Sequence, residues 1–316
     1  LGCIFATNSN QTIKAEFFAR GKVLLSGEYV AVHGAKVLAL PTKLGQRMKM
    51  QELTGSEVIW TSLDHQGKKW FEAEIDLMAF DVTHTSDEQI GKYLRKIFKA
   101  CINNNSEFLS HWKKYKIEHR LEFPREWGLG SSSTLIYNMA SWADVNPFHL
   151  YFDIESGSGC DIACAGSDGP LLYQFNQDSL SIDDVDFMPS FADSLYFVPL
   201  GKKADSRLAV KKTLNDPPEK SLVRKISEMS EKLLELKSLS AFEQWIHEHE
   251  KLIGDYLKEP TAQKSYFKDY WGAVKSLGAW HGDMVLVTSN KSEKETLDYF
   301  ASKGFGKIIP FRDLVL

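Results

Sequence analysis

Residues 124–134 of the chain read Pro-Arg-Glu-Trp-Gly-Leu-Gly-Ser-Ser-Ser-Thr. Glycines allow a backbone to take positive φ angles and to approach a ligand closely. Free N–H groups at the start of a helix attract anions, and the helix dipole adds to this attraction. The stretch therefore suits a polyphosphate, although it is not a Walker A loop, because no Gly-Lys-Ser/Thr follows four spacer residues. The residues that we expect to hold phosphate are Gly128, Leu129, Gly130, Ser131, Ser132 and Ser133.

The same stretch has a purely structural interpretation. Glycine and serine are also favoured where a tight turn leads into the N-cap of a helix. A cap needs one serine, whereas three follow one another here, from Ser131 to Ser133. The repetition favours phosphate binding but leaves the capping interpretation open.

The segments on either side predict a strand and a helix. Residues 115–123 alternate apolar and polar side chains as a strand does, and Pro124 ends the alternation. After the serines, apolar residues recur at helical spacing at Leu135, Ile136, Met139, Ala140 and Ala143. The predicted order is therefore strand, glycine-serine loop, helix.

Elsewhere the patterns predict a mixture of strands and helices and a boundary near residue 180, which gives two domains, 1–180 and 181–316. The predicted strands lie within 15–50 (joined by a glycine-punctuated loop) and at 58–60, 70–75, 171–175, 194–200 and 284–288. The predicted helices are 87–103, 219–237, 240–258 and 291–303.

Composition excludes several classes of protein. The 316 residues are 43% hydrophobic and 25% charged, a globular balance, and the net charge of −4 offers no basic field for nucleic acid or anionic lipid. No apolar run approaches the ~20 residues of a membrane helix. The four cysteines, Cys3, Cys101, Cys160 and Cys164, have no companion ligands at metal-site spacing. We expect a cytoplasmic protein without nucleic-acid or membrane partners.

Four blocks of sequence resemble the motifs of the GHMP kinases, which include galactokinase, homoserine kinase, mevalonate kinase and phosphomevalonate kinase. The first block is Ala19-Arg20-Gly21-Lys22-Val23-Leu24-Leu25-Ser26-Gly27-Glu28-Tyr29, and residues 128–134 form the second. The other two are Gly157-Ser158-Gly159-Cys160-Asp161-Ile162-Ala163, which resembles the segment of the catalytic aspartate, and Leu277-Gly278-Ala279-Trp280-His281-Gly282-Asp283. They stand in the family's order, and the details resemble mevalonate and phosphomevalonate kinases most.

The resemblance implies a two-lobed α+β fold with ATP between the lobes and Mg²⁺ as the metal. It implies that Asp161 is the general base or orients the acceptor oxygen, and that Lys22 neutralises the transferred phosphoryl group. Helix N-capping is the alternative role for Asp161. Ser132 is implied as a Mg²⁺ ligand, beside Ser131 and the loop amides on the phosphates. The residues implied to contact the acceptor are Glu28, Ser158, Gly159, Gly278 and Ala279.

The chain departs from the family pattern in three places. Arg20 stands where the family usually has proline, and Trp280 and His281 stand where it commonly has glycines. His281 is expected to be a bystander. A glutamate that often binds magnesium is missing from its usual region, where Asp144, Asp153 and Glu155 are the acids nearest in sequence.

Three functions compete on this evidence. The first is an active kinase that phosphorylates a hydroxyl or phosphate of a small acid, with mevalonate or phosphomevalonate as the leading acceptors. The second is an inactive nucleotide-binding protein of the same fold, which Trp280 and the missing glutamate suggest. The third is a sister enzyme that acts on a sugar or decarboxylates a diphosphorylated acid. Candidate cations for an acidic acceptor are Arg20, Lys202, Lys203 and Arg207.

Overall fold

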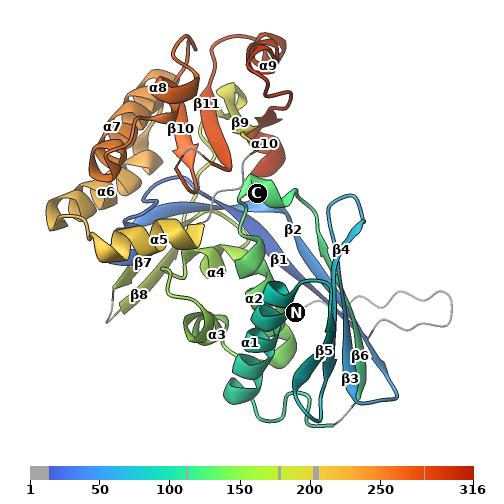
Figure 1. The fold of residues 1–316 in the computed structure, drawn as a ribbon. Coiled ribbons are helices and arrows are strands. Elements are labelled where there is room, and N and C mark those ends of the chain that lie inside the picture. The colour runs from blue at the N-terminus through green and yellow to red at the C-terminus, as the bar shows by residue number, and fades with distance from the viewer. Residues whose placement is uncertain (1–13, 112, 177–178, 202–205, 281) are drawn as a thin grey trace. The chain divides into compact units, whose positions relative to one another are not determined.

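The computed structural model describes residues 14–111, 113–176, 179–201, 206–280 and 282–316 (Figure 1). The strands are β1 (Ala15–Leu24), β2 (Val37–Leu53), β3 (Glu57–Leu63), β4 (Lys69–Asp76), β5 (Asp81–Thr85), β6 (Lys114–Leu121), β7 (Leu171–Asn176), β8 (Ser179–Asp184), β9 (Leu195–Pro199), β10 (Val274–Leu277), β11 (Met284–Thr288) and β12 (Ile309–Pro310). The α-helices are α1 (Glu88–Asn104), α2 (Ser131–Ala143), α3 (Pro147–Ile154), α4 (Cys160–Ala165), α5 (Ser206–Asn215), α6 (Lys220–Lys232), α7 (Leu239–Leu257), α8 (Ala262–Tyr266), α9 (Glu293–Ser302) and α10 (Phe311–Leu314). Short 3₁₀ turns lie at η1 (Ala31–His33), η2 (Arg125–Trp127), η3 (Ala192–Ser194) and η4 (Leu233–Glu235).

The larger sheet is mixed. Its strand order is β5-β4-β3-β6-β2-β7-β8, and β1 pairs with β2 beside this path. The pairing of β3 with β6 is parallel, and the pairing of β2 with β6 and β7 is antiparallel. Mixed sheets with helices are the architecture that the resemblance implies, so the α+β prediction is confirmed.

Contacts within the chain group it into two compact units. Unit 1 contains the described residues before Lys22, with Leu44–Arg125 and Gly130–Gly166. Unit 2 contains Lys22–Lys43, Glu126–Leu129 and Ser167–Leu316. These units are groups in space, each made of several chain segments. The predicted domain boundary near residue 180 is a statement about sequence order and stays a prediction.

The core of unit 1 lies between the sheet and helices α1, α2 and α3. Trp60 and Phe71, from neighbouring strands, are 1% and 2% exposed and meet Phe98 of α1, whose ring stands edge-on to Trp60 at 6.1 Å. Alternating burial along β6 supplies Tyr115 and Ile117 to the same core. Because residues of α2 are part of this core, the core fixes the position of the helix that follows the serine loop.

Unit 2 contains a second, four-stranded sheet with the order β10-β11-β9-β12, whose three recorded pairings are antiparallel. Helices α7 and α8 pack against β10, and α10 packs against β9 and β12 (Figure 1). Phe267 and Phe300 are fully buried in its core and stand edge-on at 5.2 Å. The rigid strand β10 leads directly into the third glycine block.

Most long elements lie where the sequence predicts them, within a few residues. A helix that the sequence analysis did not predict is α3, although its start carries a clear signal. The side chain of Asn146 caps the N–H groups of Phe148 and His149, and Pro147 occupies the first turn. Both features are typical of a helix start. Strand β8 lies across residue 180, where the sequence patterns suggested the domain boundary.

The cap of α1 gives a direct test of the local structure. The Asp87 carboxylate accepts hydrogen bonds from the N–H groups of Gln89 and Ile90, at 2.9 and 3.0 Å. We expect Asp87→Ala to lower the free energy of unfolding by about 1 kcal/mol, because a lost cap leaves two donors unsatisfied. Urea denaturation measures the loss, with Gln89→Ala as the control. Equal stabilities of the two variants would contradict this role.

Candidate active site

The glycine-serine loop has the backbone that its glycines permit. Gly128 and Gly130 have φ angles of +68° and +85°, in the left-handed region. Gly130 is the N-cap of α2, and no side chain caps this helix. The serines are therefore not used as caps, and the first N–H groups of α2 lack the intrahelical partners that later turns have. Ser132 is exposed, whereas Ser133 is buried.

The first turn of α2 is anchored to β2 inside unit 1. The Thr134 hydroxyl donates to Oε1 of Gln46, and Asn138 Nδ2 donates to the Gln46 carbonyl at 2.9 Å. Gln46 Nε2 lies 3.0 Å from Nδ1 of His119, which is fully buried. Burial lowers the pKa of His119 to about 3, so this network carries no titrating charge near neutral pH. The serine loop therefore begins on a helix that a neutral, buried network fixes to the sheet.

Two contacts within unit 2 join the glycine-serine loop to the first and third blocks. The Lys22 N–H donates to the Leu129 carbonyl at 3.0 Å, which ties the first block to the second. A Cβ at Gly128 would lie 2.5 Å from Cγ of Asp283, and one at Gly278 would lie 2.9 Å from its Oδ2. Asp283 itself is 5% exposed and has a φ of +47°. Its carboxylate thus lies against glycines of the second and third blocks.

The first block also contacts the third block directly. Glu28 is buried, and its Oε1 accepts from Nζ of Lys275 at 2.8 Å. The Tyr29 hydroxyl accepts from the backbone N–H of Trp280. Burial raises the pKa of Tyr29 well above its usual value, so this phenol stays neutral. Parts of three blocks far apart in sequence, Lys22 to Tyr29, Gly128 with Leu129, and Gly278 with Trp280 and Asp283, therefore meet within unit 2, and Lys275 just before the third block adds to their contacts.

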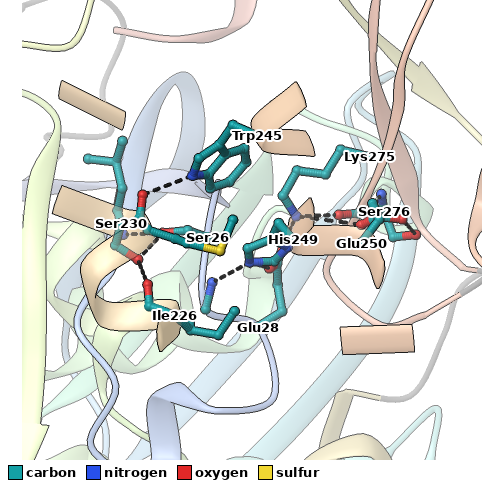
Figure 2. Close-up of polar contacts among 12 residues, drawn as sticks. Ser26, Glu28, Ile226, Ser230, Trp245, His249, Glu250, Lys275 and Ser276 are labelled. Carbon is teal, nitrogen blue, oxygen red and sulfur yellow. Dashed lines mark hydrogen bonds and ion pairs between the residues drawn. The ribbon is translucent and has the colours of Figure 1, made fainter. Parts of the chain in front are cut away.

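Lys275 belongs to a buried group of charges that the sequence did not reveal (Figure 2). Its Nζ also lies 3.9 Å from Oε1 of Glu250, a residue of α7 that is 2% exposed. Glu250 accepts two further hydrogen bonds from Ser276, at 3.0 Å from the N–H and 2.9 Å from the hydroxyl. Burial raises the pKa of Glu250 to about 7 against the opposing pull of Lys275.

Asp161 lies in unit 1, in the first turn of α4. The N-cap of this helix is Gly159, with a φ of +80°, so the capping alternative for Asp161 does not describe this structure. Asp161 is partly exposed, and α4 packs against α2, the helix that begins with the serine loop. Ser158 Oγ accepts from the Cys160 N–H at 3.3 Å.

Tyr151 organises the loop before Asp161, which the sequence analysis did not foresee. Its hydroxyl accepts from the N–H groups of Gly157 and Gly159, and a Cβ at Gly157 would lie 2.2 Å from this oxygen. Burial, followed by the negative charges of Asp161 and Glu155, raises the pKa of Tyr151 above its usual value. The phenol therefore stays protonated near Asp161.

The acids considered as extra magnesium ligands have other partners or positions. Asp153 accepts from Asn104 Nδ2 at 2.7 Å, Glu155 accepts from the Tyr93 hydroxyl at 2.7 Å, and Asp144 is the C-cap of α2. Among the described residues there is no group of three or more His, Cys, Asp or Glu side chains that could hold a metal ion. Ser132, the residue that the sequence analysis assigned to Mg²⁺, is exposed at the start of α2.

Several residues named from the sequence lie partly or wholly outside the described structure. These are His281, Lys202 and Lys203, and the side chain of Arg207 in α5. Arg20 stacks on the Phe18 ring with its guanidinium carbon 5.7 Å from the ring centroid. Ala279 is 7% exposed and accepts from the Gly282 N–H in a turn of the third block.

The contact between Gly128 and Asp283 is testable by substitution. Gly128→Ala introduces both a strained positive φ and a clash with a buried carboxylate, so we expect a loss of about 1–3 kcal/mol in unfolding free energy. Gly304→Ala is the matched control, because Gly304 has a φ of +90° and nothing within 4 Å of the added Cβ. Denaturant unfolding of both variants separates the cost of the positive φ, which both share, from the cost of the clash, which only Gly128→Ala has. Equal losses would mean that the close approach contributes nothing.

Glu250 should make stability depend on pH. The ordinary pKa of its carboxyl is 4.5, and burial raises this pKa to about 7 in the folded protein. Between these values the folded state keeps a proton that the unfolded chain has released, so stability falls as pH rises through this window. The total change is on the order of 3 kcal/mol, at about 1.4 kcal/mol for each pKa unit.

Glu250→Gln should remove this fall, because the amide cannot ionise. Urea midpoints at intervals from pH 4.5 to pH 8 measure the effect. The control is Glu243→Gln, on the same helix, whose carboxylate accepts from the Thr288 hydroxyl at 2.6 Å. If wild type and Glu250→Gln lose stability in parallel across this range, Glu250 is not the group responsible.

Comparisons with known proteins agree with the fold. No family model matches the chain, and no curated protein sequence matches it. Among solved structures, the chain is similar to the mevalonate kinase of Methanococcus jannaschii, with 15% identity over 93% of this chain and 96% of that one and a TM-score of 0.69. It is similar to the phosphomevalonate kinase of Streptococcus pneumoniae in complex with phosphomevalonate and AMPPNP, with 16% identity, coverages of 93% and 99%, and a TM-score of 0.70.

A third similar structure is the galactokinase of Lactococcus lactis complexed with galactose, with 14% identity, coverages of 91% and 88%, and a TM-score of 0.59. All three are GHMP kinases, and their acceptors differ in charge and shape. No helix in the described part of the chain is long and apolar enough to cross a membrane. The comparisons therefore show that this chain has the fold of the GHMP kinases.

Proposed function

We propose that the chain is an ATP-dependent small-molecule kinase that transfers the γ-phosphoryl group of ATP to a small acid. The observation that carries this proposal is the meeting of three sequence blocks in unit 2. The Lys22 N–H bonds Leu129, Gly128 lies against Asp283, and Tyr29 accepts from Trp280. A loop held in this way, leading into a helix start that no side chain caps, is suited to hold phosphate oxygens.

Lys22 supplies a positive charge in this proposal. Phosphoryl transfer spreads negative charge over the oxygens of the transferred group, and a fixed cation stabilises it. Lys22 lies on β1, and its backbone is tied to the phosphate loop through Leu129. This tie restricts the position from which the ammonium group extends. Ser132, exposed at the helix start, would complete the Mg²⁺ ligands, and the metal would neutralise the β- and γ-phosphate oxygens.

Asp161 acts as the base, or orients the acceptor, in this proposal. Its carboxylate takes the proton of the acceptor's hydroxyl or phosphate group while the freed oxygen attacks the γ-phosphorus. The bond from the γ-phosphorus to the bridging oxygen breaks, and ADP leaves. Tyr151, neutral and buried beside the loop of Asp161, restricts that loop through its bonds to Gly157 and Gly159.

Mevalonate and phosphomevalonate are the acceptors that we propose first. Two of the similar structures are kinases of these acids, and one of them contains phosphomevalonate with an ATP analogue. The galactokinase structure makes a sugar the next acceptor to test. A nucleotide-binding protein without turnover is the alternative that the same experiment separates.

The test measures ADP release from Mg·ATP with a panel of mevalonate, phosphomevalonate, diphosphomevalonate, galactose and homoserine. We expect turnover with one acceptor, and a loss of about 100-fold or more in kcat for Asp161→Asn and for Lys22→Met. Matched controls are Asp184→Asn and Lys92→Met, which change exposed residues outside the four blocks. Release of carbon dioxide with the diphosphorylated acid would identify a decarboxylase instead.

Binding of ATP is measured separately by calorimetry. If ATP binds and no acceptor is phosphorylated, the protein is a nucleotide-binding module and the kinase proposal fails for this panel. If ATP does not bind at all, the interpretation of residues 128–133 is wrong. Gly128→Ala should weaken ATP binding relative to Gly304→Ala, because it disturbs the loop that holds the phosphates.

A further inference from the structure

Four consecutive residues of the first block, Ser26 to Tyr29, are each held by a different segment of unit 2. Ser26 Oγ lies 2.7 Å from Ser230 Oγ on α6 and accepts from the Leu38 N–H at 2.8 Å. The Gly27 N–H donates to Nε2 of His249 on α7, at 3.3 Å. The turn that contains Glu28 and Tyr29 is therefore fixed on its N-terminal side by neutral groups (Figure 2).

On its C-terminal side the turn is held by charge. The side chains of Lys275, Glu28 and Glu250 are 1%, 7% and 3% exposed, and they come from β10, the loop after β1, and α7. Lys275 is 2.8 Å from Glu28 and 3.9 Å from Glu250. Removing three charged groups from water is expensive, so an arrangement of this kind is a poor source of stability. The arrangement does fix the position of the turn that carries Glu28.

Two atoms in this group have no hydrogen-bond partner among the described residues. They are Oε2 of Glu28 and Nδ1 of His249, both inaccessible to solvent. His249 Nε2 accepts from Gly27, which leaves the ring proton on Nδ1. Burial and the charge of Lys275 lower the pKa of His249 well below its usual value. His249 is therefore neutral, and it does not neutralise Glu28 at 3.8 Å.

The ammonium group of Lys275 therefore lies near two carboxyl groups, those of Glu28 and Glu250. Whether Glu250 carries a proton decides whether one or both of them are charged. The groups that face Glu250 are Lys275 and Ser276 from β10, and Glu28 and Tyr29 from the loop after β1. His249 adjoins it on α7 but is neutral, as is Tyr29. When Glu250 is protonated, Lys275 forms an ion pair with Glu28 alone. When Glu250 is ionised, the two carboxylates compete for the same ammonium group.

The turn is linked to the phosphate loop by contacts already described. Tyr29 accepts from Trp280, and the same block brings Gly278 against Asp283. Asp283 in turn lies against Gly128. All these residues belong to unit 2, so a displacement of the Glu28 turn has a continuous packed route to the loop.

We propose that Lys275 and Glu250 are positioning residues for the proposed phosphoryl transfer: they hold the Glu28–Tyr29 turn against the third block, and the proton on Glu250 sets how firmly it is held. Neither residue contacts the reacting groups in this proposal, which rests on the proposed function. The protonated form gives the firmly held turn. Activity therefore falls as Glu250 ionises.

Glu250→Gln tests the proposal, because the amide keeps the size of the protonated carboxyl and never ionises. Steady-state kcat and KM are measured from pH 6 to pH 8 with the acceptor that the panel identifies. The ratio of wild-type kcat to Glu250→Gln kcat should fall about threefold to tenfold over this range, within the effects known for residues that act through packed contacts. Using the ratio cancels the pH dependence of ATP and of the acceptor, which is common to both proteins. Glu243→Gln is the control and should give a constant ratio.

A second measurement does not depend on catalysis. Hydrogen exchange of the Gly27 and Trp280 amides, corrected for intrinsic exchange, reports whether the turn and the third block are held in the ligand-free protein. Protection at both amides should decrease from pH 6 to pH 8 in the wild type and stay constant in Glu250→Gln. A purely structural role for Glu250 would lower protection at these two amides and at core amides of β11 together, through global unfolding, whereas the proposal expects a loss confined to Gly27 and Trp280.

Each combination of results has a distinct meaning. Parallel kcat profiles and unchanged protection would overturn the proposal. Changed protection with parallel kcat profiles would show that the turn responds to the proton but does not position the reaction, which also overturns it. If no acceptor is phosphorylated, the proposed function fails; constant protection in the wild type then overturns the holding role, and pH-dependent protection supports that role alone.

Discussion

The carboxylate of Asp283 is the constraint around which the rest of the site in unit 2 is organised. It lies so close to Gly128 and Gly278 that neither position has room for a Cβ. Both glycines and Asp283 itself have positive φ angles, a strained choice for an aspartate. Such strain persists only where the surroundings enforce it. The surroundings here are the loop that holds Leu129 against Lys22 and the turn that holds Trp280 against Tyr29.

The buried charges around Lys275 serve specificity of structure more than stability. A hydrophobic replacement of similar volume would avoid the cost of removing three charged groups from water. Such a replacement would also lose the hydrogen bonds from Lys275 to Glu28 and from Ser276 to Glu250, which define one position for the turn. The neutral network of Gln46, Thr134 and His119 does the equivalent work in unit 1 without charge. The group around Lys275 contains a carboxyl, that of Glu250, with a pKa of about 7, whereas the histidine of the Gln46 network, His119, has a pKa of about 3 and stays neutral.

The sequence predicted what depends on local pattern. Periodicity gave α1, α2, α7 and most of the strands, and the glycines at 128 and 130 indicated the positive φ angles of the loop. It could not predict Lys275 or Glu250, because a lysine in a short strand and a glutamate in an amphipathic helix are ordinary surface residues by pattern. Their burial depends on β10 meeting the loop after β1, a contact between residues 247 positions apart. Tyr151 escaped notice for another reason: its contacts with Gly157 and Gly159 are close in sequence, but it lies on α3, a helix that the sequence analysis did not predict.

Trp280 shows how the third block accepts a large residue where the family commonly has glycine. The hydrogen bond from this block to Tyr29 comes from the Trp280 backbone N–H, and the contact with Gly128 comes from Asp283, so neither of these two contacts requires a particular side chain at position 280. The indole itself is directed elsewhere: its Nε1 donates to the Pro260 carbonyl at 2.9 Å, and a Cβ at Gly254 would lie 3.5 Å from its ring. Its ring also meets Tyr29 edge-on at 6.4 Å. The substitution is thus accommodated beside the end of α7, and the backbone contacts that carry the proposed function are kept.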